Sequence, residues 1–258
     1  MTESKLFVAG NWKMNGLEAD LKEIEAVKAG ISSGGPDVAI YPPATLLHQA
    51  ATVAKGSRIV IGGQDCSPQA KGAFTGDLSA PILKDAGATS VIVGHSERRH
   101  GHGETNEVVR AKAEAGLKSG LKVVVCIGET KDERLAGQAA DVCARQLAGS
   151  LPNDSTPDTV IVAYEPVWAI GTGLSPTTPD ITAIHEVVRS ELKKRFPGSA
   201  GHWRVLYGGS VTASNAASIF ESDEVDGVLV GGASLKADSF LAIIAAAKEA
   251  EERRSRKV

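Results

Sequence analysis

Residues 160–165 read Val-Ile-Val-Ala-Tyr-Glu, a run of apolar and β-branched side chains that ends abruptly in a carboxylate. Continuous hydrophobicity of this kind is typical of a strand that is buried on both faces in a parallel sheet. Seven similar runs recur along the chain, at Leu6–Trp12, Val38–Tyr41, Ile59–Gly63, Ser90–His95, Lys122–Ile127, Arg204–Gly208 and Gly227–Gly231. The sequence therefore predicts eight strands, with Glu165 at the carboxyl end of the sixth.

Helical patterns lie between these runs. Apolar residues spaced by three and four predict two amphipathic helices, one on Leu17, Leu21, Ile24, Val27 and Ile31 and one on Ile181, Ile184, Val188 and Leu192. We expect Thr178 to cap the second helix, with Pro179 in its first turn, where the missing N–H has no cost.

Eight strand–helix units in 258 residues predict an α/β chain that forms a single-domain (β/α)8 barrel over residues 1–258. Functional sites of such barrels lie at the carboxyl ends of the strands. A doubly wound open sheet is the alternative, but the first strand ends in Asn11-Trp12-Lys13 and lacks a glycine-rich dinucleotide fingerprint.

Composition narrows the classes of partner. The formal net charge is -3, so no basic field favours nucleic acid or an anionic membrane. Cys66, Cys126 and Cys143 form no CxxC pair, which argues against a disulfide framework or a zinc site and favours a reducing cytoplasm. We expect no export signal and no membrane helix.

Polar side chains stand where three of the predicted strands end. Asn11 and Lys13 share one side of the first strand, and a lysine there suits a phosphate or an oxyanion, although an isolated lysine is more often solvated. His95 precedes a segment whose backbone N–H groups, at a helix start, would hold its imidazole neutral and able to donate a proton. Glu165 is followed by Pro166 and by no cation, which favours a general base.

The segment after Glu165 has the composition of a mobile lid. It combines an apolar stretch that follows neither a helical nor a strand period with two glycines that could act as hinges. A packed structural loop is the alternative. The predicted lid consists of Pro166, Val167, Trp168, Ala169, Ile170, Gly171, Thr172 and Gly173.

Two diglycine pairs end the seventh and eighth strands, in Tyr207-Gly208-Gly209-Ser210 and Val230-Gly231-Gly232. Glycine lets backbone N–H groups approach an anion closely, and these two strand ends form the usual phosphate site of this barrel. A tight turn would explain either pair alone, but the two together predict phosphate binding.

Five segments, taken together and in this order, resemble the triosephosphate isomerase family. They span nearly the whole chain and are Ala9–Asn15 (AGNWKMN), Val93–Arg99 (VGHSERR), Ala163–Gly173 (AYEPVWAIGTG), Tyr207–Val211 (YGGSV) and Leu229–Ser234 (LVGGAS). The resemblance implies interconversion of dihydroxyacetone phosphate and D-glyceraldehyde 3-phosphate through an enediolate, in glycolysis and gluconeogenesis, without a metal or an organic cofactor.

The same resemblance implies the residue roles, which are known for the family. Glu165 would move the proton between the two carbons, and His95 would protonate and deprotonate the two oxygens. Lys13 and Asn11 would stabilise the negative charge, with Glu97 as a partner of Lys13. Main-chain N–H groups would hold the phosphate, at Gly171 on lid closure and at Ser210, Gly231 and Gly232.

The segment Gln64–Ser79 is too long for an ordinary loop, and its length predicts either a function or disorder. In the family this loop inserts into a neighbouring subunit, so the resemblance implies a homodimer in which Phe74, Thr75 and Gly76 reach the partner and Thr75 braces the partner's Asn11 and Lys13. A lid or packing loop within one chain is the alternative.

Some residues depart from the family pattern. Asp65, Cys66-Ser67 and His102 replace residues near the expected interface, so its strength and pH dependence are open. Leu174-Ser175-Pro176 replaces a lid end that often begins with lysine, so the lid kinetics are open as well. Cys126 matches a family cysteine and is predicted to be buried packing, because the strand around it is apolar.

Three alternative functions remain at this point. A paralogue that acts on a tetrulose phosphate would keep every catalytic residue. A non-catalytic sugar-phosphate-binding barrel or scaffold would tolerate the loss of Glu165 or His95, and neither is lost. A Schiff-base aldolase would use Lys13, but the sixth strand ends in a carboxylate base and no lysine stands there.

Overall fold

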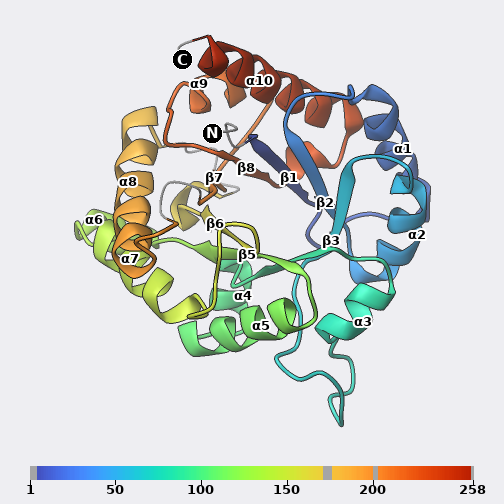
Figure 1. Cartoon of the computed structure of the whole chain (residues 1–258), viewed down its shortest axis with the longest axis horizontal. Helices are drawn as coiled ribbons and strands as arrows, with labels where there is room; N and C mark the ends of the chain where they lie inside the picture. Colours follow the sequence, from blue (N-terminus) through green and yellow to red (C-terminus); the bar gives the residue numbers. More distant parts are fainter. Residues whose placement is uncertain (1–4, 171–175, 200–202, 257–258) are drawn as a thin grey trace.

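The computed structural model describes residues 5–170, 176–199 and 203–256. Its eight strands run parallel and close into a barrel in the order of the sequence, with β8 paired to β1 (Figure 1). The strands are β1 (Phe7–Asn11), β2 (Asp37–Tyr41), β3 (Ile59–Gly63), β4 (Ser90–Val93), β5 (Lys122–Ile127), β6 (Val160–Tyr164), β7 (Val205–Tyr207) and β8 (Gly227–Val230). The predicted (β/α)8 barrel is confirmed.

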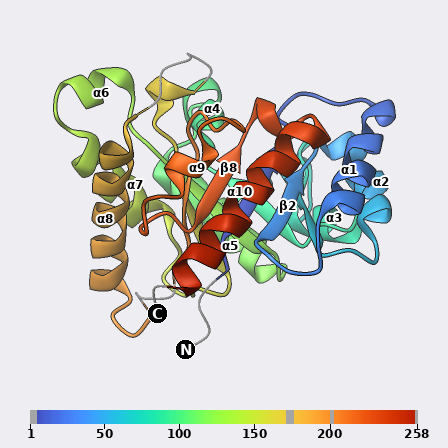
Figure 2. The ribbon, with the colours of Figure 1, turned by 90° about the horizontal axis from the view of Figure 1, so that it is seen from above.

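Helices surround the barrel and cover its outer face (Figures 1 and 2). The described α-helices are α1 (Leu21–Gly30), α2 (Ala44–Ala54), α3 (Ala80–Asp85), α4 (Ser96–Gly101), α5 (Asn106–Lys118), α6 (Lys131–Leu135), α7 (Ala139–Ser150), α8 (Thr178–Arg195), α9 (Ala216–Ile219) and α10 (Ala237–Ser255). Short 3-10 helices lie at η1 (Glu18–Asp20), η2 (Val167–Ala169) and η4 (Gly232–Ser234). None of the helices described is long and apolar enough to cross a membrane.

Two details of the predicted helices were wrong. The first pattern begins too early, because the chain turns at Gly16 (φ +107°) and leaves Leu17 75% exposed before η1 and α1. The second helix is capped by Thr177 instead of Thr178: the Thr177 hydroxyl accepts the N–H of Asp180, whose carboxylate in turn accepts from Thr177. Pro179 does lie in the first turn, as predicted.

The core has two parts. One fills the space between the barrel and its helices, and the other fills the barrel with side chains that alternate along each strand. Phe7 and Ala9 on β1 and Ile161 and Ala163 on β6 belong to the inner part. Side chains two residues apart on a strand point to the same face. Asn11 follows Phe7 and Ala9 in this spacing, and Glu165 follows Ile161 and Ala163, so both lie at the carboxyl mouth of the barrel.

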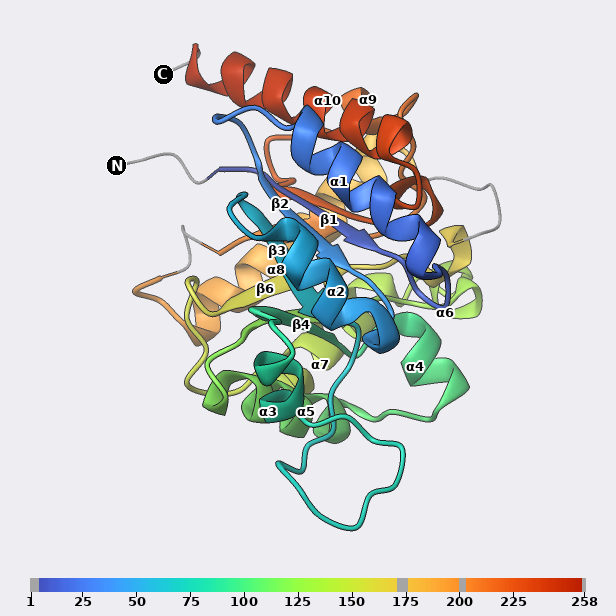
Figure 3. The same ribbon diagram turned by 90° about the vertical axis from the view of Figure 1, so that its right-hand side faces the viewer.

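The segment between β3 and α3 extends away from the barrel as a long loop (Figure 3). A short parallel bridge between Ser67 and Ser79 closes its base. At its far end the Phe74 side chain is 47% exposed. The loop thus presents an apolar residue at a distance from the core of its own chain.

Candidate active site

A pocket of about 330 Å³ opens at the carboxyl mouth of the barrel. It brings together strand ends that lie far apart in the sequence, on β1, β6, β7 and β8. Its lining includes Asn11, Lys13, Asn15, His95, Glu165, Ile170, Gly208, Gly209, Ser210, Val211, Thr212, Leu229, Val230, Gly231, Gly232 and Ala233. Of the residues predicted to catalyse the reaction, all but Glu97 line this pocket.

Glu165 lies at the base of this pocket with only 1% of its surface exposed. One carboxylate oxygen, Oε1, is 2.9 Å from His95 Nε2, and the other accepts the backbone N–H of Ser96 at 2.8 Å. Burial raises the pKa of this carboxyl, but His95, the Ser96 N–H and the charge of Lys13 lower it by more. The carboxylate is therefore ionised at neutral pH and able to accept a proton.

His95 is the N-cap residue of α4, as the predicted helix start required. Its Nδ1 accepts the backbone N–H of Glu97 at 3.2 Å, so this nitrogen carries no proton. The one ring proton lies on Nε2, which faces Glu165. The amino terminus of α4 thus selects a neutral tautomer whose N–H points into the pocket.

Two opposing effects act on the titration of His95. Burial lowers its pKa, whereas the contact with the Glu165 carboxylate raises it, and in this arrangement the pKa lies above the usual range. The charge of Lys13 also lowers it. If the carboxylate leaves Nε2, burial and Lys13 are the larger effects that remain, and both favour the neutral imidazole.

Lys13 follows β1 in an unusual backbone conformation, with φ at +53°. Its N–H donates to Asn11 Oδ1 at 3.0 Å, and its Nζ donates to Glu97 Oε1 at 2.6 Å. The structure therefore places Asn11, Lys13 and Glu97 side by side, as the motif comparison implied. The ammonium group lies at the rim of the pocket, with its side chain 24% exposed.

The two diglycine pairs line the other side of the pocket. A Cβ on Gly208 would lie 2.9 Å from Glu165 Cγ, and one on Gly209 would lie 2.1 Å from Tyr207 Oη, so neither position tolerates a larger residue without movement. Ser210, Gly231 and Gly232 line the same wall. Gly171, the remaining predicted phosphate ligand, lies outside the described residues.

Only the first part of the predicted lid is described. Pro166 is followed by η2, a short 3-10 turn, and Ile170 lines the pocket. Trp168 Nε1 donates to the fully buried Glu129 carboxylate at 2.9 Å, which fastens this end of the segment to the end of β5. Gly171, Thr172, Gly173, Leu174 and Ser175 lie outside the described residues.

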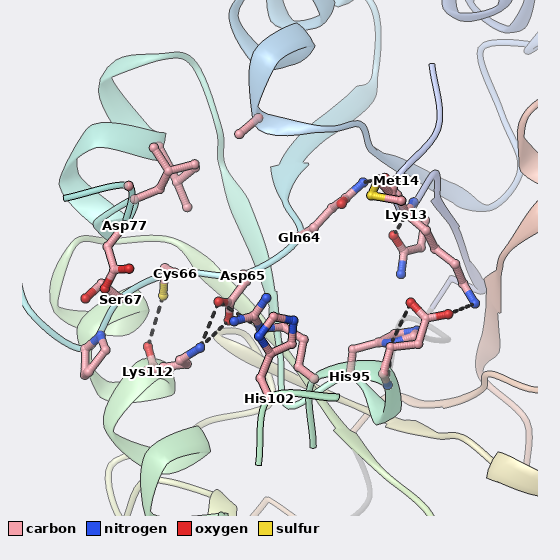
Figure 4. Close-up of a pocket in the computed structure, with 18 residues that line it drawn as sticks. Lys13, Met14, Gln64, Asp65, Cys66, Ser67, Asp77, His95, His102 and Lys112 are labelled. Carbon is pink, nitrogen blue, oxygen red and sulfur yellow. Dashed lines mark hydrogen bonds and ion pairs between the residues drawn. The ribbon is translucent and has the colours of Figure 1, made fainter. Parts of the chain in front are cut away.

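A second pocket, of about 490 Å³, adjoins the first and is bordered by the loop after β3 (Figure 4). Asn11, Lys13 and His95 line both pockets. Asp65 and His102, which depart from the family pattern, line the second pocket.

A charge cluster lies beside this second pocket. The buried Lys112 ammonium donates to Asp65 at 2.8 Å and to Glu104 at 2.6 Å, and Arg98 contacts the same two acids. Cys66 is buried there, and burial raises its pKa to about 12. Asp65 is therefore held by cations, so its charge is compensated within this chain.

The sequence did not reveal several contacts of the site. The Ser96 N–H that binds Glu165 has no side-chain signal, because any residue there supplies it. Gln64 reaches the backbone of Lys13, and the Arg99 guanidinium binds the carbonyl oxygens of Gly94 and Cys126 behind the pocket. Cys126 is fully buried in the barrel interior, as predicted, and burial raises the pKa of its thiol.

The fold and the pocket define a (β/α)8 barrel whose carboxyl mouth pairs a buried carboxylate with a histidine 2.9 Å away. Comparison with known proteins identifies the family: the triosephosphate isomerase family model matches residues 6–247. Triosephosphate isomerase of Rhodopseudomonas palustris is 55% identical over 245 residues, 93% of this chain and 97% of that protein. Triosephosphate isomerase of Afipia carboxidovorans is 56% identical, over 92% and 95%.

A solved structure gives the same result. The crystal structure of triosephosphate isomerase from Bartonella henselae superposes with a TM-score of 0.89 at 44% identity, and the match covers 94% of this chain and 98% of that one. The chain belongs to the triosephosphate isomerase family, whose members are aldose–ketose isomerases that interconvert triose phosphates. Nothing in the comparisons favours a tetrulose-phosphate isomerase or a non-catalytic barrel.

Proposed function

We propose that Glu165 and His95 carry out the interconversion of dihydroxyacetone phosphate and D-glyceraldehyde 3-phosphate in this chain. The observation that carries the proposal is the buried Glu165 carboxylate, which lies 2.9 Å from His95 Nε2 in a pocket with a lysine on one side and two diglycine turns on the other. Glu165 removes a proton from the carbon beside the carbonyl and returns it to the neighbouring carbon.

Glu165 must move before it can do so. In this structure both of its oxygens are engaged, by His95 and by the Ser96 N–H. A substrate whose oxygens meet His95 would separate the pair and leave the carboxylate over the carbon atoms. His95 is then neutral for the reasons given above, and its Nε2 proton serves the developing oxyanion.

The remaining polar groups have supporting roles in this proposal. Lys13 and Asn11 stabilise the negative charge of the enediolate, and Glu97 orients Lys13 through the 2.6 Å contact. The N–H groups of Ser210, Gly231 and Gly232 bind the phosphate, joined by Gly171 when the lid closes. Closure of the lid over the pocket excludes water and disfavours loss of the phosphate from the intermediate.

A coupled assay of glyceraldehyde 3-phosphate isomerisation tests the proposal. Wild type, Glu165→Gln and a control, Glu221→Gln, which alters an exposed carboxylate after α9, are compared at equal concentration. We expect wild type and Glu221→Gln to be active, and kcat of Glu165→Gln to fall by at least about 100-fold, the lower range for loss of a general base. A folded but inactive wild type would contradict the proposal, and turnover of tetrulose phosphates would then be measured.

We also propose that the chain is a homodimer that uses the loop after β3. The Phe74 side chain at the end of the loop is 47% exposed, and Met14, beside the second pocket, is 97% exposed. A partner's Phe74-Thr75-Gly76 in the second pocket would bury Phe74, cover Met14 and contact Asn11 and Lys13, so one interface would remove both apolar side chains from water.

Sedimentation equilibrium distinguishes this arrangement from a loop that packs only within one chain. We expect a dimer for wild type and for Leu135→Asp, which changes an exposed residue of α6. Phe74→Asp should shift the population toward monomer and reduce activity with it. A monomeric wild type that is fully active would contradict the proposal.

Pathway, location and domain organisation complete the proposal. We place the reaction in glycolysis and gluconeogenesis in the cytoplasm, where the three cysteines, free and buried in the structure, remain reduced. We propose that residues 1–258 form one domain, because the barrel strands extend from Phe7 to Val230 and α10 packs back on β1. Cell fractionation with the activity assay checks the location.

A further inference from the structure

We propose that Gln64 is a positioning residue for Lys13: its side-chain amide holds the backbone of Lys13 in the conformation that directs the ammonium group to the site. The inference rests on the proposed function, in which Lys13 stabilises the charge of the enediolate. Gln64 does not touch the reacting atoms in this account. It acts through the backbone carbonyl of Lys13.

The conformation of Lys13 needs such support. Within the part of the chain that the structure describes, Lys13 is the one non-glycine residue with a positive φ, at +53°. A side chain in this left-handed region costs free energy, and the conformation persists only where neighbouring groups determine it. Relaxation to a negative φ would turn the peptide carbonyl and carry the lysine side chain away from Glu97.

Three side chains fix three different groups of Lys13. Asn11 Oδ1 accepts its N–H at 3.0 Å, and Glu97 Oε1 accepts its Nζ at 2.6 Å. Gln64 Nε2 donates to its carbonyl oxygen at 2.9 Å. Asn11 and Glu97 already belong to the proposed site. Gln64 is the third contact, and it holds the Lys13 carbonyl, whose direction changes if the residue leaves the left-handed conformation.

Gln64 is itself anchored, so it can impose a position. The same Nε2 donates its second hydrogen to the carbonyl oxygen of Tyr41, the last residue of β2, at 2.8 Å. Tyr41 is fully buried, and its carbonyl also accepts the N–H of Trp12. Figure 4 shows the Gln64 side chain reaching from the start of the loop toward Lys13 and Met14. One amide thus ties the turn after β1 to the rigid end of β2.

The test compares Gln64→Met with wild type and a matched control. Methionine keeps the length of the side chain and removes both donors. Gln138→Met makes the same change at an exposed residue before α7 whose side chain forms no capping hydrogen bond. We expect kcat/KM of Gln64→Met to fall about tenfold, the factor that corresponds to one hydrogen bond of about 1.4 kcal/mol. Gln138→Met should match wild type.

The inhibition constant of inorganic phosphate distinguishes a positioning role from a purely structural one, because a purely structural role would leave it unchanged. Because Lys13 faces the anionic ligand, its displacement should raise the inhibition constant of phosphate in Gln64→Met while the midpoint of unfolding changes little. Gln64→Glu serves as a second variant if the first does not fold, since a carboxylate has the same size and no N–H to donate. An inhibition constant and a kcat/KM within twofold of wild type would overturn the inference.

A double-mutant cycle decides whether Gln64 acts through Lys13. In a Lys13→Met background, Gln64→Met should cause no further loss of kcat/KM, because the group that it positions is gone. An equal loss of kcat/KM in both backgrounds overturns the inference. A loss that disappears when the protein concentration is raised also overturns it, because that result would assign Gln64 to subunit association. An inactive wild type overturns the proposed function itself, whereas an active wild type with an unchanged Gln64→Met overturns this inference alone.

Discussion

Acidification should destabilise this barrel through His185, which does not line the site pocket. His185 lies on α8 with none of its surface exposed, its Nδ1 is 3.0 Å from the carbonyl oxygen of Glu224, and its Nε2 has no partner among the described residues. Burial lowers its pKa to about 4, from 6.5 for an unperturbed histidine.

The sign and size of the effect follow from this difference. The unfolded chain binds the proton below about pH 6.5 and the folded chain only below about pH 4, so the free energy of unfolding falls as the pH drops through this window. Above it, both states hold a neutral imidazole and the effect is absent. A difference of about 2.5 pKa units corresponds to about 3 kcal/mol lost across the window.

Urea unfolding at fixed protein concentration measures the effect, at several pH values between 7.5 and 4.5. His185→Gln keeps a donor for the Glu224 carbonyl and removes the titration, so its midpoint should depend less on pH than that of wild type. His48→Gln, on the exposed face of α2, should keep the wild-type dependence. Parallel decline of wild type and His185→Gln would refute the reasoning.

Two further substitutions test the charge cluster and the packing behind the site. Lys112→Met should cost about 1–3 kcal/mol in the free energy of unfolding, because the buried Glu104 carboxylate, 2.6 Å from the Lys112 ammonium, loses one of its two cations and keeps Arg98; an unchanged free energy in urea unfolding would contradict this. Gly128→Ala should lower kcat as well as stability, because its Cβ would lie 1.7 Å from the carbonyl oxygen of Glu165; unchanged kcat would show that the base tolerates the shift.

The fold could be predicted because its signals are local and repeated. Each strand is a short apolar run, and the eight runs are spaced as strand–helix units require. The predicted runs extend past several observed strands, at Trp12, His95, Glu165, Gly208 and Gly231. At these positions the backbone leaves the ladder to form the mouth of the barrel. His95, Glu165, Gly208 and Gly231, which end four of these runs, line the site, whereas Trp12 is buried in the core between the barrel and its helices.

The finer geometry could not be predicted, because it depends on contacts between distant segments. A positive φ at Lys13 carries no sequence signal, since lysine is not a residue that favours it. Its partner Gln64 lies 51 residues away in the sequence. Glu165 contacts His95 and Ser96, which precede it by about 70 residues. Motif resemblance supplied the identities of the groups, and only the closed barrel supplied their distances.

The contact between Glu165 and His95 leads to one more prediction, about the imidazole. The Glu165 carboxylate is the largest cause that raises the pKa of His95, while burial and Lys13 lower it. Glu165→Gln removes that negative charge without changing the length of the side chain. The pKa of His95 should therefore be lower in Glu165→Gln than in wild type, which is the condition that the proposed mechanism needs when substrate separates the two groups.

Nitrogen-15 NMR of the imidazole, followed from pH 5 to pH 9, measures this pKa directly. Glu97→Gln is the matched control, since its carboxylate is 3.7 Å from His95 Nδ1 and 55% exposed, and water screens it more strongly. It should lower the pKa of His95 by less than Glu165→Gln does. A pKa of His95 that stays the same or rises in Glu165→Gln would contradict this prediction. It would mean that the α4 amino terminus, and not Glu165, sets the charge of the imidazole in the absence of substrate. Movement of Glu165 would then not be what keeps His95 neutral.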